Sequence, residues 1–275
     1  METKNIKYHP IHPALRPYLF GILHCRIKKN DEKILTNLYP TDYAILCFDR
    51  HKKHFTDAYK QNKYNYTSCY LGLTEFRRSF SESTEEVFQV IFKPFGVYAI
   101  FGLPQHELSN RITDGDMVFP DTMSIQTFLE YESDPGACLR QIERWLLHHL
   151  SRRQNIHKEP LMRACNKIYQ SRGKIFLKHL SREVGMSERN LRYYFHEQVG
   201  VGPKTFIRLV RFNFINRFLA PSSVVDWNEI AYLFGFFDQN HFIKEFKWFY
   251  GITPRMYTKI TQFNLSEQIT RSFSV

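Results

Sequence analysis

The stretch FGFFDQNHFIKEFKWFYGITPRMY, residues 234–257, contains nine aromatic residues among 24 and threads three basic residues between them. Phe242, Phe246 and Phe249 follow the i, i+4, i+7 spacing that places side chains on one face of an α-helix. Asp238 is a good N-cap residue, so the helix has a local start signal. The pattern predicts a helix whose aromatic face packs and whose polar residues face outward.

The same order of residue types occurs twice in the chain. At an offset of 51 residues, two apolar positions, a glycine, a proline, a basic residue and an aromatic residue coincide. The pairs are Leu191 with Phe242, Phe195 with Phe246, Gly200 with Gly251, Pro203 with Pro254, Lys204 with Arg255 and Phe206 with Tyr257. Internal repetition of this kind indicates two copies of one structural unit.

Each copy follows a short apolar segment that ends in glycine. The first segment ends at Gly185 and is followed by Ser187, which can cap a helix running to about Gln198; the second ends at Gly235. A helix, a glycine turn and a second helix form the signature of a helix-turn-helix. The next apolar anchor comes six residues after Gly185 but seven after Gly235, so the second turn is predicted to be one residue longer.

Residues 203–219 are predicted to form a long helix between the two units. Pro203 is tolerated in a first helical turn, where its missing N–H would have no partner, and Phe206, Val210 and Phe214 continue along one face. A stiff connector would let the second helices of both units enter successive major grooves, about 34 Å apart.

The charge of the chain is concentrated in this region. Residues 158–260 contain 17 Lys and Arg against 8 Asp and Glu, so they hold most of the net charge of +11. Phosphate contacts supply the sequence-independent part of DNA affinity, and clustered basic charge suits such a partner. Together with the duplicated motif, this charge predicts binding to double-stranded DNA.

The duplicated motif resembles the DNA-binding domain of the AraC/XylS family of bacterial transcription regulators. The second unit of that family typically reads GFxDxSxFxRxFKxxxGxTPxxY. The matching residues here are Gly235, Phe236, Asp238, Asn240, Phe242, Lys244, Phe246, Lys247, Gly251, Thr253, Pro254 and Tyr257. The first unit fits a looser SxRxLxRxF pattern through Ser187, Arg189, Leu191 and Phe195, with Tyr193 where an arginine is common. The resemblance covers residues 158–260 and implies a cytoplasmic, sequence-specific transcription regulator that is not an enzyme.

The resemblance also implies which side chains meet DNA. Base reading is assigned to Arg189, Arg192 and Tyr193 in the first unit and to Gln239, Asn240, Ile243 and Lys244 in the second. Arginine can bond to guanine, Gln or Asn to adenine, and an aliphatic chain can meet the thymine methyl. For Ile243, packing against a neighbouring side chain is an equal alternative.

Phosphate contacts are assigned to four further cations, each of which is otherwise a solvated surface charge. They are Lys204, Arg208, Lys247 and Arg255. The aromatic residues at core-type positions are assigned to packing, in preference to stacking on unpaired bases. They are Phe195, Phe206, Phe234, Phe242, Phe246 and Tyr257.

The rest of the chain predicts a mainly β N-terminal domain, so that the fold class is α+β with an all-α C-terminal domain. Strands are predicted at 18–27, 43–48, 66–73 and 87–92, turns at 28–33 and 60–65, and helices at 95–101 and around 138–149. Residues 1–120 are predicted to be a sensor-like or oligomerisation domain, 121–157 a helical connector and linker, 158–260 the double helix-turn-helix domain, and 261–275 a tail. Residues 92–108 resemble a segment of the N-terminal sensor-like domains of some AraC-type regulators.

Composition limits the partners. The start of the chain lacks the apolar run of a signal peptide, and no stretch approaches a membrane span. Five cysteines without a CxxC pair fit a reducing cytoplasm. Beyond the DNA operator, a small-molecule effector, a second copy of the chain and RNA polymerase are further candidate partners.

The predicted N-terminal domain also contains residues that could take part in metal or enzyme chemistry. His51 and His54, with Glu75 or His106, could hold a metal in a β-barrel, but HKKH also suits a solvated basic turn, which is the preferred interpretation. No metal, cofactor or catalytic residue is therefore predicted. The alternatives to a regulator are a ligand-binding or enzymatic β domain localised by basic helices, and an RNA-binding protein, whose usual single-strand signatures are missing.

Overall fold

The computed structural model describes residues 4–27, 34–57, 63–82, 86–153, 159–219 and 226–260. The described N-terminal part contains one eight-stranded sheet in which every pair of neighbours is antiparallel. Its strands are β1 (Lys4–His9), β2 (Leu19–Ile27), β3 (Ile34–Leu38), β4 (Ala44–Asp57), β5 (Lys63–Leu71), β6 (Arg78–Glu82), β7 (Glu86–Phe92) and β8 (Ile112–Asp114). The order is β1-β2-β7-β4-β5-β8, with β6 pairing both β3 and β4.

The four predicted strands correspond to β2, β4, β5 and β7, but two predicted turns are wrong. Strand β4 continues to Asp57 with a register shift between Phe48 and Lys53, so HKKH is strand and not turn. Strand β5 begins at Lys63, inside the predicted turn 60–65. The other predicted turn, 28–33, lies outside the described residues. Composition misleads here because polar, charged residues are common in strands at exposed or edge positions.

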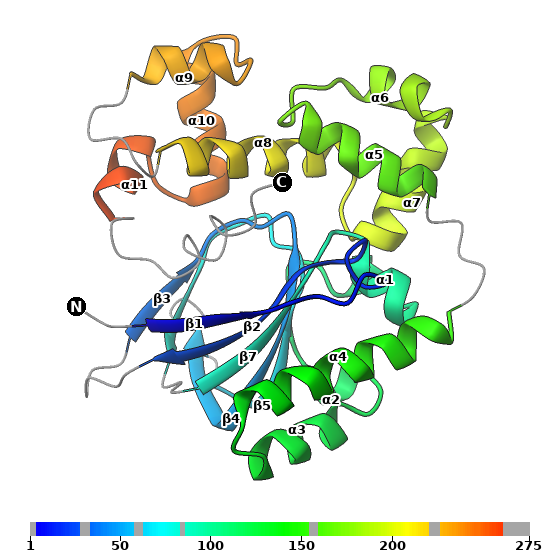
Figure 1. Cartoon of the computed structure of the whole chain (residues 1–275). Helices are drawn as coiled ribbons and strands as arrows, with labels where there is room; N and C mark the ends of the chain where they lie inside the picture. The colour runs from blue at the N-terminus through cyan, green and yellow to red at the C-terminus, as the bar shows by residue number, and fades with distance from the viewer. Residues whose placement is uncertain are drawn as a thin grey trace.

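Helices flank β8 in the sequence. They are α1 (Gly96–Phe101), the 3₁₀ helix η1 (Gln105–Glu107), α2 (Gly115–Val118), α3 (Thr122–Tyr131) and α4 (Pro135–Ser151). The last two of them, α3 and α4, lie along one side of the sheet (Figure 1). Helix α4 starts where local signals place it, since Asp134 accepts bonds from the N–H groups of Gly136 and Ala137 and Pro135 occupies the first turn. Trp145 then packs edge-on against Phe48 of the sheet, with ring centroids 6.0 Å apart. Both helices predicted in this region are confirmed.

The C-terminal part is helical and lies on the opposite side of the sheet from α3 and α4 (Figure 1). Its helices are α5 (Glu159–Gln170), α6 (Leu177–Val184), α7 (Glu188–Val199), α8 (Pro203–Leu219), α9 (Trp227–Leu233), α10 (Gln239–Tyr250) and α11 (Pro254–Ile260). The predicted long helix, 203–219, has the bounds of α8. Residues 154–157 of the predicted connector and linker lie outside the described residues.

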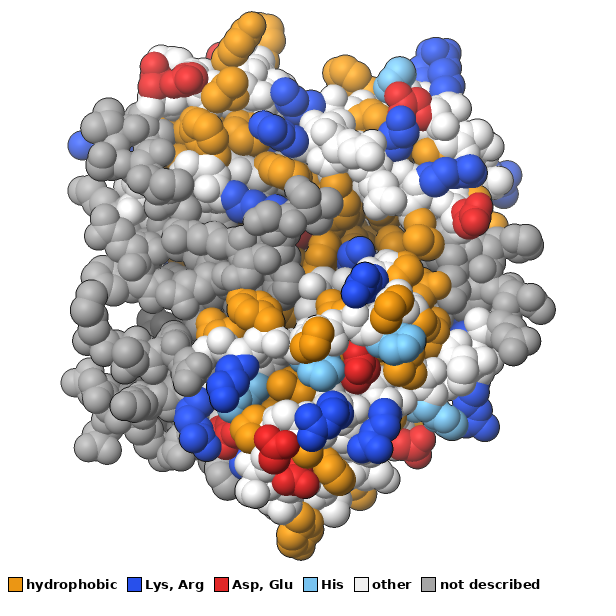
Figure 2. All heavy atoms as spheres, in the orientation of Figure 1, with side chains coloured by type: hydrophobic (Ala, Val, Ile, Leu, Met, Phe, Trp, Pro, Cys, Tyr) orange, Lys and Arg blue, Asp and Glu red, His pale blue; other side chains and the backbone are white. Residues whose placement is uncertain are grey.

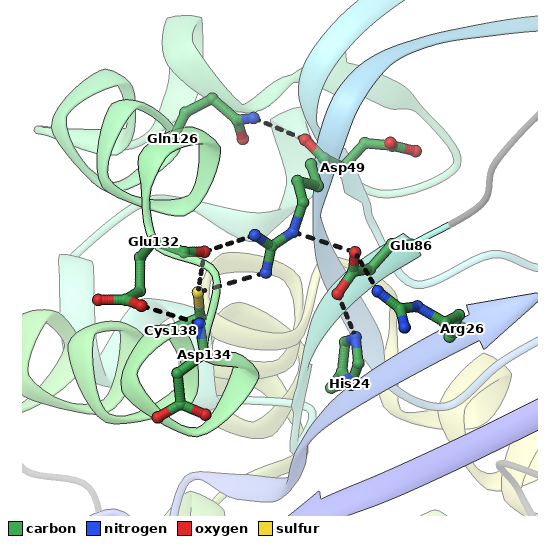
Figure 3. A network of polar contacts seen from close by, with 9 residues as sticks. His24, Arg26, Asp49, Glu86, Gln126, Glu132, Asp134 and Cys138 are labelled. Atoms are coloured by element: carbon green, nitrogen blue, oxygen red, sulfur yellow. Dashed lines mark hydrogen bonds and ion pairs between the residues drawn. The ribbon is translucent and has the colours of Figure 1, made fainter.

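A network of polar side chains joins the sheet to the α3–α4 connection (Figure 3). The Arg50 guanidinium pairs with the Glu86 carboxylate at 3.1 Å and also donates to the carbonyl of Glu132. Its other end reaches the Cys138 sulfur at 3.7 Å. Glu86 in turn meets the His24 ring at 2.7 Å. One arginine thus ties two strands to the start of α4.

Burial and pairing shift the pKa values of this network in a consistent way. Burial, together with the charges of Arg26 and Arg50, lowers the pKa of His24 against the opposing effect of Glu86. Burial would raise the pKa of Glu86, but the hydrogen bond with His24 and the charges of Arg50, His24 and Arg26 outweigh it, so this pKa lies below its ordinary value. At neutral pH the pair is therefore a neutral imidazole and a carboxylate.

We expect the His24 ring to titrate below its ordinary pKa of 6.5. Because the folded state binds this proton less tightly than the unfolded state, the contribution of His24 to the free energy of unfolding is present above pH 6.5 and is lost as the pH falls through the folded pKa. NMR titration of the ring measures the midpoint directly. Urea unfolding from about pH 7 to about pH 5 should show a smaller loss of stability in His24→Gln, which keeps an N–H donor and does not titrate. A midpoint at or above 6.5 would contradict the buried neutral state.

Candidate nucleic-acid interface

The first helical unit consists of α6, a glycine turn and α7. Gly185 ends α6 in the left-handed region at φ 67°, and the N–H of Met186 returns to the carbonyl of Ser181 at 3.0 Å. Ser187 then caps α7 by accepting from the N–H of Asn190 at 3.1 Å. These local bonds fix the angle between the two helices, as the sequence predicts.

Helix α7 divides into a buried face and an exposed face. Leu191 and Phe195 are fully buried in the helical core. The three predicted base-reading residues of this unit, Arg189, Arg192 and Tyr193, are all exposed. Arg192 pairs with Glu188 one turn earlier, with 2.8 Å between nitrogen and oxygen. Since an exposed i, i+4 ion pair stabilises a helix by only about 0.3–0.5 kcal/mol, a stronger hydrogen-bond acceptor can replace Glu188 as the partner of Arg192.

The second unit repeats this construction with α9 and α10. The N–H of Phe236 returns to the carbonyl of Ala231 at 2.8 Å, and Asp238 caps α10 through the N–H of His241 at 2.7 Å. Two residues separate Gly235 from Asp238, against one between Gly185 and Ser187, so the predicted longer turn is confirmed.

The predicted base-reading residues of α10 differ in exposure. Asn240 and Lys244 are exposed, and Gln239 is half-buried. Ile243 is half-buried and packs against the aromatic core, so the structure favours the packing role among its two predicted roles. Phe242 and Phe246, on the opposite face, are fully buried.

The four predicted phosphate-contacting cations also divide. Lys204, Lys247 and Arg255 are exposed. Arg208 is half-buried, pairs with Glu245 at 2.8 Å and lies over the rings of Trp248 and Phe249. The guanidinium of Arg208 is thus already engaged within the protein. Figure 2 shows Lys and Arg side chains over both helical units on the face in view, with acidic side chains among them.

Helix α8 carries both units, one at each end (Figure 1). Near its start Phe206 packs against Phe195 of α7, with centroids 5.6 Å apart. Further along, Phe212 contacts four aromatic rings of the second unit: Phe236, Phe246, Phe249 and Tyr250. All six aromatic residues assigned to packing from the sequence are buried.

Contacts between the sheet domain, meaning the described residues between 4 and 153, and the helices after it include three that the sequence did not reveal. At the middle of α8, the Asn213 amide donates to the Asp42 carboxylate at 2.9 Å, and both side chains are buried. Burial raises the pKa of Asp42, against the opposing charge of Arg217 and the bond from Asn213. At the end of the second unit, Tyr39 lies against Tyr250 and Tyr257, with centroids 5.4 and 4.9 Å apart.

The third contact lies at the C-terminal end of α7. The ring of His106 stacks on His196 at 4.5 Å, and its Nδ1 lies 3.5 Å from the Glu197 carboxylate. Gly200, at φ 94°, lies so close to η1 that a β-carbon would collide with Ser109 and with the carbonyl of Gln105. The sheet domain therefore holds the C-terminal ends of both second helices and leaves their N-terminal halves exposed.

Residues 180–260 match the family model described as a helix-turn-helix domain. This match begins within α6 and continues through α7, the long helix α8 and the whole second unit to the end of α11. The C-terminal part of this chain is an AraC-type helix-turn-helix domain. No curated protein matches the chain in sequence.

Solved structures of regulators resemble the chain more distantly. ToxT from Vibrio cholerae is 13% identical, with 94% of this chain and 98% of ToxT covered and a TM-score of 0.43. The xylose-binding transcription activator XylR is 22% identical over 46% of this chain and 39% of its own, with a TM-score of 0.33. The AraC-like transcriptional activator CuxR is 13% identical over 78% and 81%, with a TM-score of 0.31.

The candidate metal-binding residues have other partners where the structure describes them. Glu75 accepts from the Asn110 side chain at 2.9 Å, and His106 belongs to the contact with α7. The side chains of His51 and His54 lie outside the described part. Within the described ranges, no group of three His, Cys, Asp or Glu residues could hold a metal ion. No described helix has the length and hydropathy needed to cross a membrane.

We expect the contact between Asp42 and Asn213 to hold the sheet domain against the AraC-type domain. Replacing either residue by alanine leaves the other buried without this bond, which costs about 1–3 kcal/mol. In a double-mutant cycle followed by urea unfolding, Asp42→Ala and Asn213→Ala should couple by about 0.5–1.5 kcal/mol. Strictly additive losses would show that the bond does not contribute to the stability of the folded protein.

Proposed function

We propose that this protein is a sequence-specific DNA-binding transcription regulator whose two second helices, α7 and α10, read successive major grooves on one face of the duplex. The observation that carries the proposal is the paired arrangement. Two helices with locally capped N-termini present exposed polar side chains, and one helix joins their units. Side chains near the start of the second helix make the base contacts in helix-turn-helix proteins.

The connector has suitable dimensions. Helix α8 contains 17 residues and is thus about 25 Å long at 1.5 Å per residue. Successive major grooves on one face lie about 34 Å apart. The length of α8 together with the width of the units at its two ends is enough to cover that distance. Aromatic packing at both ends limits rotation of either unit about α8.

In this proposal base reading belongs to Arg189, Arg192 and Tyr193 in the first unit and to Gln239, Asn240 and Lys244 in the second. Lys204, Lys247 and Arg255 would meet phosphates, and their exposure supports this. Ile243 packs on the core and Arg208 pairs with Glu245, so these two residues are not among the main proposed DNA contacts.

The domain division is part of the proposal, with residues 1–120 sensing a small molecule or mediating self-association, 121–157 connecting, 158–260 binding DNA and 261–275 forming a tail. A signal would act by changing the balance between docked and released states of the two parts. The contacts of Asp42, Tyr39 and His106 support this, since they touch both units. Equal DNA affinity in the wild type and in a variant lacking these contacts would contradict it.

Selection from random duplex DNA by the full-length protein tests the function itself. We expect a recovered sequence with two half-sites about 10 base pairs apart, centre to centre, because each unit occupies one major groove. A pool without any shared sequence would reject sequence-specific binding. It would then favour the alternative of a ligand-binding or enzymatic β domain that uses its basic helices for localisation.

We expect Arg192→Ala to relax the preference at one position within one half-site. If the arginine binds guanine through two hydrogen bonds, the loss at that position is about 1–3 kcal/mol, with little change elsewhere. Binding curves on operators that vary at each position measure this. Uniform weakening over all sequences would instead place Arg192 on the phosphate backbone.

A further inference from the structure

The second unit contains one residue that has no counterpart in the first. Met186 follows Gly185 and packs partly against the helical core. Phe236 occupies the corresponding place after Gly235, with its ring 5.2 Å from that of Phe242, and is 8% exposed. The extra residue of the longer turn is therefore Phe237.

Phe237 is 91% exposed, so its ring contributes little to the stability of the fold. A large apolar side chain that stays in water does not contribute the free energy that its burial would add to folding. Its backbone position is fixed, because Phe236 is anchored on one side and Asp238 caps α10 on the other. Figure 2 shows hydrophobic side chains at the top of the view, over α9 and the turn that follows it.

The place of Phe237 relates it to DNA in the proposed function. It precedes the N-cap of α10, and the N-terminal end of a recognition helix is the end that meets base edges in the major groove. The apolar group that base edges offer in that groove is the 5-methyl of thymine, and phenylalanine is one of the side chains that contact it. Stacking on the face of a base would require a base that is unpaired, flipped or partly unstacked, and apolar side chains that insert between paired bases do so from the minor groove.

We propose that Phe237 is a specificity-determining residue that packs on the 5-methyl group of a thymine in the half-site read by the second unit. The inference rests on the proposed function and adds a contact that the polar residues of α10 cannot make. It also assigns thymine recognition to Phe237 in place of Ile243, whose side chain packs on the core. The first unit lacks an equivalent residue, so methyl recognition distinguishes the two half-sites.

Thymine-to-deoxyuracil replacement tests the contact, since it removes the methyl group and retains the base pairing. Each thymine of the operator recovered by selection is replaced in turn, and the affinity of the full-length protein is measured at fixed salt. In the wild type we expect a loss of about fourfold at one thymine of the second half-site, as for one methyl-sized group returned to water. In Phe237→Ala the same replacement should have no effect.

Tyr232→Ala is the matched control, because Tyr232 is also an exposed aromatic of the second unit, at 85%, but belongs to α9. It should keep the wild-type uracil profile. An operator without a methyl-sensitive thymine, or a uracil effect that persists in Phe237→Ala, would overturn the inference and leave the proposed function standing. Loss of transcription by Phe237→Ala with an unchanged uracil profile would also overturn it and assign the ring to a protein partner. A selection that recovers no shared sequence would reject both the proposed function and the role of Phe237.

Discussion

The aromatic packing along α8 determines how the helical part of this protein is arranged. Phe206 joins the connector to the first unit and Phe212 joins it to the second. Each fully buried large side chain stabilises the fold by about 1.5–3 kcal/mol, whereas an exposed ion pair such as Arg192 with Glu188 contributes about 0–1 kcal/mol. The buried rings therefore hold the units in place, and polar side chains such as Asn240 and Lys244 remain exposed to solvent.

Helix α8 is buried on more than one side, because the sheet domain also rests on it. Its buried residues include Asn213 and Asn216, two polar side chains that would be costly without partners. Asn213 finds Asp42 of the sheet domain, and Asn216 accepts a bond from the Tyr257 hydroxyl. The same helix thus links the two helix-turn-helix units to each other and both of them to the N-terminal part.

The helical part was predictable from sequence because its boundaries depend on local chemistry. Left-handed glycines such as Gly185 and caps such as Ser187 act within a few residues of the chain. The repeat is visible when the sequence is compared with itself at an offset of 51 residues. The contacts that the sequence did not reveal are long-range ones: Asp42 and Asn213 lie 171 residues apart. Strands β1, β3, β6 and β8 were missed because pairing with a neighbour, and not their own composition, makes them strands.

Gly200 serves two purposes at one position. Its backbone angle ends α7, and its missing side chain admits η1 of the sheet domain. Any β-carbon there would strain the end of α7 and would also push η1 of the sheet domain away from it. A substitution at this site would therefore alter both the interface and α7, and a change confined to one of them could not compensate for it.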